Sequence, residues 1–150
     1  MRHGFTSTAA FAVGAAALGV LIAAPSTPPA AAAPVVGFTL CHTGGGTNCV
    51  VDGDTIWFAG EKVRIADIDA PETHPSRCPL EAALGRRATQ RLQAMLNAGA
   101  VTLSDEGSDR YGRRLAVVRR DGRSLGMALV AEGLARPWEG RRRPWCDAQA

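Results

Sequence analysis

The fold is decided by residues 48–68, which read N48-C-V-V-D-G-D-T-I-W-F-A-G-E-K-V-R-I-A-D-I68. Apolar and β-branched residues dominate three runs in this stretch, and they predict strands over 48–51, 55–59 and 62–68. Asp52-Gly53 and Ala59-Gly60 predict the turns between these strands. Because such turns are far too short for the crossover that parallel neighbours need, we expect the three strands to pair antiparallel.

The pattern on either side of this stretch completes a small α+β domain. Apolar residues fall at helical spacing from Leu80 to Leu96, behind Pro79 and ahead of Gly99, which suits a C-terminal cap. Ser124 is placed to cap a second helix over 125–132, which Gly133 would end. Further strands are expected at 35–40, 101–103 and 115–118, with a turn at Asp121-Gly122. The resulting order, β-β-β-α-β-β-α, favours a five-stranded barrel carrying helices over a parallel sheet.

Length and charge exclude several classes of protein. With 150 residues, 46% of them apolar, the chain suits one globular domain, and neither Gly nor Pro shows the short period of a fibrous protein. The charge is uneven, because residues 34–85 hold three basic and seven acidic residues, whereas residues 86–150 hold thirteen Arg and seven acidic residues. Arg supplies sixteen of the seventeen basic residues, which suits bidentate binding of phosphate but also follows from GC-rich coding.

Residues 1–33 have the features of a secretory signal peptide. Arg2 and His3 precede an unbroken apolar run from Ala9 to Ala24, and the Pro- and Ala-rich stretch that follows offers cleavage after Ala32. A run of sixteen residues is shorter than the ~20 of a spanning helix, so a cleaved signal is favoured over a membrane anchor. We therefore expect a secreted or periplasmic monomer without stable membrane association. The remaining chain divides into an N-terminal segment with a Gly-rich turn (34–47), a main domain (48–136) and an Arg-rich tail (137–150).

Four cysteines follow the proposed signal, and an exported protein meets an oxidising compartment. We expect two disulfides, Cys41 with Cys49 and Cys78 with Cys146, because Gly44-Gly45-Gly46 would let the first pair close locally. Sequence alone leaves the other pairings open. The alternative is a zinc site formed by three of the cysteines with His42 or His74, although no two cysteines have the close spacing that is typical of structural zinc sites.

Carboxylates gather between Val51 and Glu72, and an arginine lies among them; the residues are Asp52, Asp54, Arg64, Asp69 and Glu72. Such side chains suit a hard divalent cation, which prefers oxygen ligands. Asp-Gly is also the commonest hairpin turn, so V-D-G-D-T alone predicts a turn more readily than a metal site. Ala70 precedes Pro71 and is therefore pushed toward extended backbone, which would let its carbonyl project into the same site. Strict alternation from Arg64 puts Asp69 on the opposite face, so the chain must bend at Asp69 for the two side chains to converge.

Four motifs occur in order along the chain: V51-D-G-D-T55, V63-R-I-A-D-I-D-A-P-E-T73, D109-R-Y-G-R113 with L115-A-V-V118, and A128-L-V-A-E-G-L-A135. Together they resemble the staphylococcal nuclease (thermonuclease) family, over roughly residues 48–136. The resemblance implies an OB-fold barrel and a calcium-dependent nuclease that hydrolyses phosphodiesters in DNA and RNA.

The same resemblance implies a role for each matched residue. Asp54 and Asp69 match metal carboxylates, Ala70 matches a backbone-carbonyl ligand, and Asp52 matches an acid with an indirect contact to Ca²⁺. Arg64 and Arg113 match phosphate-binding arginines, and Glu72 matches the general base. Tyr111, with Arg110 beside it, matches a position near the substrate phosphate.

The chain departs from the family pattern after Ala135. Pro144 and the charged run make a third helix unfavourable, and a Cys78–Cys146 bridge would replace its packing. Trp138 is the nearest candidate for an aromatic base-binding residue, with packing of the tail as the alternative. Arg141–Arg143 is interpreted as a solvated run or as a contact to the nucleic-acid backbone, and no role is assigned to Asp67. A non-catalytic OB-fold module that binds nucleic acid or another anion is the alternative function.

Overall fold

The computed structural model describes residues 37–42 and 45–146. The predicted signal segment, the first residues of the strand expected at 35–40, and Gly44 lie outside these ranges. Within them, none of the helices has the length and apolar character needed to cross a membrane.

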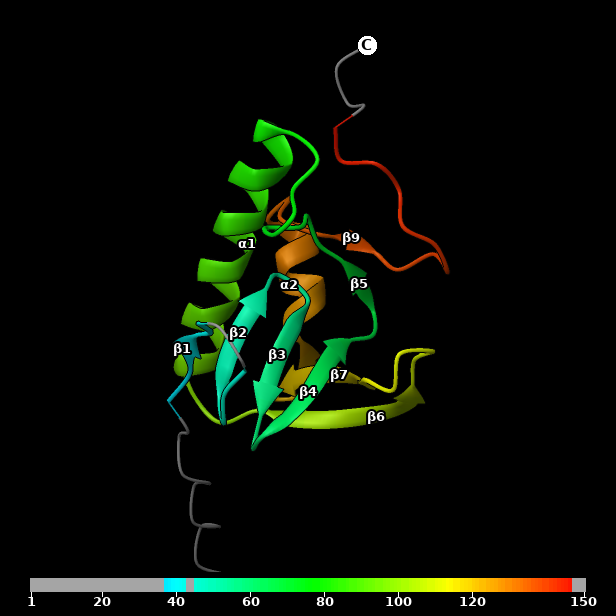
Figure 1. The fold of residues 1–150 in the computed structure, drawn as a ribbon. Coiled ribbons are helices and arrows are strands. Elements are labelled where there is room, and N and C mark those ends of the chain that lie inside the picture. The colour runs from blue at the N-terminus through cyan, green and yellow to red at the C-terminus, as the bar shows by residue number, and fades with distance from the viewer. Residues whose placement is uncertain (1–36, 43–44, 147–150) are drawn as a thin grey trace, which may run out of the picture. The chain divides into compact units, whose positions relative to one another are not determined.

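The described residues form an OB-fold-like α+β domain built on one mixed sheet (Figure 1). The sheet order is β1-β2-β3-β4-β7-β6, with β8 paired to β7. β4 and β7 run parallel, and so do the short β1 and β2, while the other pairs are antiparallel. The strands are β1 (Thr39–Leu40), β2 (Cys49–Asp52), β3 (Thr55–Phe58), β4 (Glu61–Ile65), β6 (Thr102–Ser108), β7 (Arg114–Arg120) and β8 (Arg123–Ser124). The predicted class and the antiparallel pairing of the first three predicted strands are confirmed.

Two of the predicted turns contain residues in the left-handed backbone conformation, which glycine adopts readily. Ala59 and Gly60 both have positive φ (51° and 84°), as do Asp121 and Gly122 (49° and 75°). Gly53 is required for a different reason, since a Cβ there would lie 2.7 Å from the Cβ atoms of both Ala70 and Ala88. The β2–β3 turn is therefore held tightly against the neighbouring loop and helix.

Both predicted helices are present and begin at side-chain caps. Helix α1 (Pro79–Asn97) starts after Cys78, whose sulfur accepts the Glu81 N–H, and the Glu81 carboxylate accepts the Arg77 N–H at 2.6 Å. Helix α2 (Leu125–Ala131) starts after Ser124, whose hydroxyl accepts the Met127 N–H at 3.0 Å.

Asp67 contacts Ser124, the residue that caps helix α2. The Ser124 hydroxyl donates to its carboxylate at 2.6 Å, so Asp67 fixes the start of α2. A residue to which the sequence assigned no function is therefore structural.

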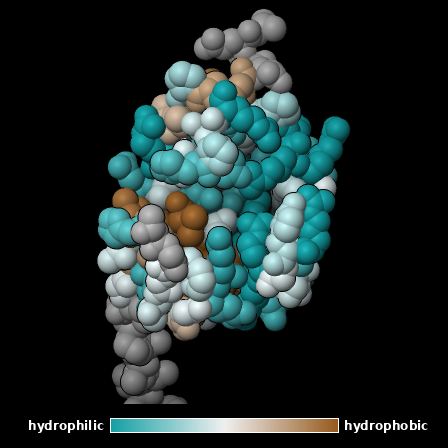
Figure 2. All heavy atoms as spheres, in the orientation of Figure 1, coloured by the Kyte–Doolittle hydropathy of each residue, from teal (hydrophilic) through white to brown (hydrophobic). Residues whose placement is uncertain are grey.

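The core lies between the sheet and the helices. Helix α1 packs on β2, and α2 packs on β7 (Figure 1). The largest fully buried aliphatic side chains include Ile56, Ile65, Ile68, Leu92, Leu96 and Leu129. Burial of each such side chain contributes roughly 1.5–3 kcal/mol, which fixes the sheet and the helices as one unit. The face drawn in Figure 2 is mostly hydrophilic.

The single strand predicted over 62–68 is wrong. The chain turns at Ala66-Asp67, which separates β4 from β5 (Ile68–Asp69). The Arg64 side chain explains the break, because its Nη1 donates to the carbonyls of both Ile65 and Ile68 and so closes the bend around itself. The strand predicted at 101–103 is longer than expected and occupies Thr102–Ser108.

The tail packs onto the domain. β9 (Arg136–Pro137) pairs antiparallel with β5, and the Trp138 N–H donates to the Asp67 carbonyl at 2.9 Å. Trp145 is buried beneath the Arg136 guanidinium, which lies 3.8 Å from the ring centroid.

Both predicted disulfides, Cys41–Cys49 and Cys78–Cys146, are present. The alternative zinc site would need three of these sulfurs as thiolates, so the disulfides exclude it in this state of the protein.

Candidate active site

The bend before Asp69 brings the acidic residues of two loops together. Asp54 lies in the β2–β3 turn, and its Oδ2 accepts the Ala70 N–H at 2.9 Å. Asp69 ends β5, and Asp54 and Asp69 are both buried, at 2% and 3% exposure. Glu72 follows three residues later and is half-buried. The convergence that strict strand alternation would have prevented is therefore achieved by the break at 66–67.

Arg64 is the buried cation of this group. Its Nη2 lies 3.0 Å from Asp54 Oδ2, while Nη1 is held by the two backbone carbonyls of the bend. Burial lowers the pKa of Arg64, and the charge of Asp54 opposes that shift. Arg64 is thus fixed in position by hydrogen bonds that do not involve a substrate.

Arg142, from the tail, lies directly against three carboxylates. Its Nε is 3.4 Å from Asp69 Oδ1, its Nη2 is 3.7 Å from Asp54 Oδ2, and its Nη1 pairs with Glu72 Oε1. The Arg-rich run was interpreted from sequence as solvated or as a contact to nucleic acid. Arg142 is partly solvated and is also paired with acids, because the chain before it is held by β9 and the chain after it by the Cys146 disulfide.

Burial makes the negative charge of the cluster unfavourable without a cation. It raises the pKa of Asp52 to about 7, with a further contribution from the charge of Asp54. Burial also raises the pKa of Asp69, and Arg142 opposes that shift. Asp52 itself accepts the Asp54 N–H at 3.2 Å.

The donor set fits a hard divalent cation, although its present arrangement is built around a guanidinium. In the described part of the chain, no three His, Cys, Asp or Glu side chains converge closely enough to hold a metal ion. However, Asp69 Oδ1 is buried and accepts no hydrogen bond from the described residues, its contact with Arg142 Nε at 3.4 Å being ionic, and the neighbouring donors are carboxylate oxygens. Oxygen donors of this kind are what Ca²⁺ and Mg²⁺ prefer.

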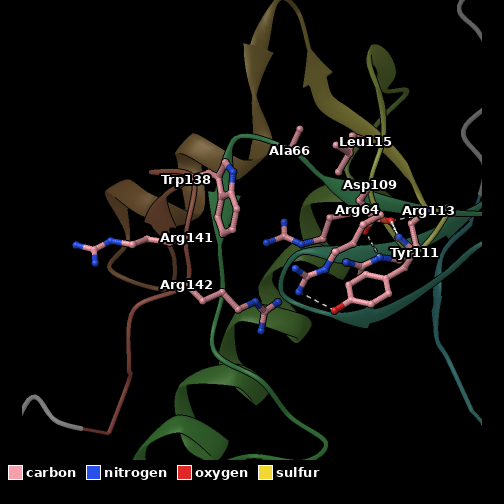
Figure 3. A pocket seen from close by; sticks show the side chains of 11 residues that line it. Arg64, Ala66, Asp109, Tyr111, Arg113, Leu115, Trp138, Arg141 and Arg142 are labelled. Carbon is pink, nitrogen blue, oxygen red and sulfur yellow. Dashed lines mark hydrogen bonds and ion pairs between the residues drawn. The ribbon is translucent and has the colours of Figure 1, made fainter.

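A cleft of about 590 Å³ is lined by Arg64 and Arg142, the two arginines that pair with the carboxylates (Figure 3). Tyr111 and Trp138, both exposed, also line it, together with five arginines: Arg64, Arg110, Arg113, Arg141 and Arg142. In Figure 3, Arg113 and Tyr111 lie on one side, Trp138 lies on the other, and Arg141 points away from the group.

The residues of the 109–113 turn hold one another in position. Arg113 Nε donates to Asp109 Oδ2 at 2.6 Å, and Arg110 Nη2 donates to the Tyr111 hydroxyl at 2.8 Å. Both guanidiniums lie over the Tyr111 ring, at 5.7 Å and 4.8 Å from its centroid. These side chains therefore present positive charge and an aromatic face to the cleft.

The structure thus places the sequence-predicted residues in two groups. Asp54, Asp69, Glu72 and Arg64 meet at the carboxylate cluster, while Arg113, Tyr111 and Arg110 line the cleft. Sequence reasoning missed Arg142 in the cluster. The signal that could have found it is Cys146, four residues on, because the predicted disulfide already returned the tail to the start of α1.

The domain thus combines an OB-fold-like sheet and two helices with an acidic cluster beside an arginine-lined cleft. A model of the family described as "Staphylococcal nuclease homologue" matches residues 62–149, more than half of the chain, and the chain belongs to this family.

Among curated relatives, Endonuclease YncB of Bacillus subtilis (strain 168) is 42% identical over 94 residues, which cover 57% of this chain and 44% of that protein. Thermonuclease of Staphylococcus intermedius is 36% identical over 93 residues, covering 58% and 55%. Micrococcal nuclease of Shigella flexneri is 41% identical over 73 residues, covering 46% and 38%. The chain spans about half the length of these relatives, or less.

Proposed function

We propose that this protein is a secreted, calcium-dependent nuclease that hydrolyses phosphodiester bonds in DNA and RNA. The observation that carries the proposal is the convergence of Asp54, Asp69 and Glu72 on one cationic group at the edge of an arginine-lined cleft. Family membership and relatives named as endonucleases and as a thermonuclease support it.

The acidic residues would hold the cation. Asp54 and Asp69, with the Ala70 carbonyl, are the proposed ligands, and Asp52 acts indirectly through its hydrogen bond to the Asp54 N–H. When bound, Ca²⁺ would polarise a phosphoryl oxygen and offset its negative charge. So few protein ligands leave several of the 6–8 coordination positions to water and substrate, which suits a weak site in the range of about 10⁻⁴–10⁻³ M.

The arginines and Glu72 would supply the remaining chemistry. Arg113 would exchange its Asp109 partner for a bidentate contact with the phosphate oxygens, and Arg64 would turn its Nη2 from Asp54 to the phosphate. Glu72 takes or orients the proton of the attacking water. The Tyr111 hydroxyl and Arg110 contact the phosphate from the same turn.

Secretion is supported by the two disulfides, which persist in oxidising compartments. They agree with the signal-like composition of residues 1–33, so we propose a secreted or periplasmic location for the protein.

The proposal is tested by incubating the purified protein with single-stranded DNA and with RNA, in calcium or in a chelator. We expect both polymers to be degraded in calcium and neither in chelator, because without the metal ion nothing in the cluster polarises the phosphoryl oxygen. Asp69→Asn removes a proposed ligand and should strongly reduce cleavage, whereas Asp121→Asn, in the exposed β7–β8 turn, should not. Equal cleavage in chelator contradicts the metal assignment. Salt-sensitive binding without any cleavage supports the non-catalytic module instead.

A further inference from the structure

Arg142 stands between the carboxylate cluster and the cleft, and it belongs to both. Its guanidinium contacts Asp54, Asp69 and Glu72, while the same residue lines the cleft beside Arg64. The side chain retains 34% exposure, although the Asp54 and Asp69 side chains are almost completely buried. The guanidinium therefore covers the open side of the cluster.

The tail holds this guanidinium at the cluster from both directions. β9 pairs with β5 just ahead of the run, and the Cys78–Cys146 disulfide fixes the chain just beyond it. Between them, Arg136 Nη1 donates to the Pro144 carbonyl at 3.0 Å. Because the chain is fixed at both ends, Arg142 acts at a high effective concentration.

Charge makes the guanidinium and a divalent cation mutually exclusive at these oxygens. Arg142 contacts Asp69 Oδ1 and Asp54 Oδ2, so a cation bound at either oxygen would take the place of the guanidinium. A cation placed on them would also lie within a few ångströms of the guanidinium and repel it strongly.

We propose that Arg142 is the internal counter-ion of the carboxylate cluster and that a divalent cation binds there by displacing it. The displaced guanidinium remains in the cleft, where it meets the substrate phosphate. That this cation is Ca²⁺ rests on the proposed function. The displacement makes the metal site weaker than its ligands alone would be, because only the fraction of molecules with Arg142 withdrawn can bind the ion.

The test is calcium binding to the full chain, measured by calorimetry without nucleic acid. Arg142→Gln keeps most of the side-chain length and removes the charge, so we expect calcium to bind at least ~10-fold more tightly. Arg143→Gln is the matched control, because Arg143 is the next residue and pairs only with exposed Glu139, at 3.5 Å, among the described residues. Its calcium affinity should equal that of the parent. Arg142→Lys keeps a positive charge and should bind calcium more weakly than Arg142→Gln.

Melting in chelator supplies a readout that needs no catalysis. Arg142→Gln should melt at lower temperature than the parent and Arg143→Gln, because Asp69 and Glu72 lose the guanidinium paired with them and Asp54 keeps only Arg64. Calcium should then raise its melting temperature more than it raises that of the parent. If Arg142→Gln does not fold in chelator, recovery of the fold on addition of calcium supports the proposal, and failure to recover overturns it.

Two results separate this inference from the proposed function. Equal calcium affinity of the parent and Arg142→Gln, or weaker binding by Arg142→Gln, overturns the displacement alone. Absence of calcium binding in the parent and in every variant contradicts the metal of the proposed function, and the displacement with it.

Discussion

Glu72 is the residue at which catalysis and binding should separate. It is half-buried, and its carboxylate pairs with Arg142 at the edge of the cluster. Glu72→Gln keeps the shape of the side chain and removes the proton acceptor, so turnover should fall roughly 10²–10⁴-fold, with nucleic-acid affinity almost unchanged. Initial rates at saturating single-stranded DNA, with a parallel binding titration, measure the two effects.

Arg113→Ala provides the contrast in the same assay. Arg113 lies in the cleft and would bind the phosphate both before and during reaction, so both rate and affinity should fall, the rate by about 100-fold or more. Arg143→Gln again serves as the control, with both quantities at the parent level. If both Glu72→Gln and Arg113→Ala retain full turnover, the nuclease roles of these residues are wrong.

At this scale the sequence named residues of the cluster whose motifs are local. Asp54, Arg64, Asp69 and Glu72 lie within two short motifs, but strand alternation put Asp69 on the opposite face, and their convergence depends on the break at 66–67. Arg142 could not be found in that way, because three successive arginines look the same whether they are solvated or paired with acids. The position of Arg142 depends on the Cys78–Cys146 disulfide, whose cysteines are 68 residues apart in sequence, and a local sequence pattern does not reveal so distant a contact.

Among the elements, helix α1 approaches the loop that carries Glu72 closely at one glycine. A Cβ at Gly85 would lie 2.8 Å from the carbonyl oxygens of both Pro71 and Glu72. Gly85→Ala would gain about 1 kcal/mol of helix propensity, but overpacking against backbone typically costs about 1–3 kcal/mol. We expect a net loss of roughly 1 kcal/mol in the free energy of unfolding, and slower cleavage because the loop that carries Glu72 is displaced.

Gly37→Ala is the control for this change, since a Cβ there meets no atom within 4 Å. Urea unfolding of both variants, with cleavage rates, makes the comparison. Parent-like stability and activity of Gly85→Ala would show that α1 and the loop adjust freely and that the close approach has no functional role.

The helices could be predicted from the sequence, whereas the tight packing at Gly53 and the bend between β4 and β5 could not. Both helices were predicted almost to the residue, because periodicity and caps are local signals. Gly53 was assigned correctly to a turn, yet its requirement arises from Ala70 and Ala88, which are distant in sequence. The break between β4 and β5 was missed because Ile65 and Ile68 are equally buried on both sides of it, and an apolar run does not reveal where a side chain such as Arg64 will bend it.

Across the whole molecule, the two disulfides connect very different lengths of chain. Cys41–Cys49 closes a separation of 8 residues at the edge of the sheet, whereas Cys78–Cys146 closes 68 residues and joins the start of α1 to the tail. The second bridge therefore restricts most of the domain. It also links stability to the site, because Arg142 lies between this bridge and β9.

Removing each bridge separately should expose that difference. The loop-closure entropy of the unfolded chain predicts a loss of ~4 kcal/mol for Cys78–Cys146 and ~2.5 kcal/mol for Cys41–Cys49. Serine replacements suit the longer bridge, because the hydroxyl introduced by Cys78→Ser would still cap α1, and serine replacements at Cys41 and Cys49 provide the matched control. Urea unfolding measures both losses.

Calcium calorimetry should also show tighter binding only when the Cys78–Cys146 bridge is absent, since the freed tail holds Arg142 less firmly at the carboxylates. Equal losses of stability, or unchanged calcium affinity after release of the tail, would contradict the view that this bridge fastens both the fold and the counter-ion.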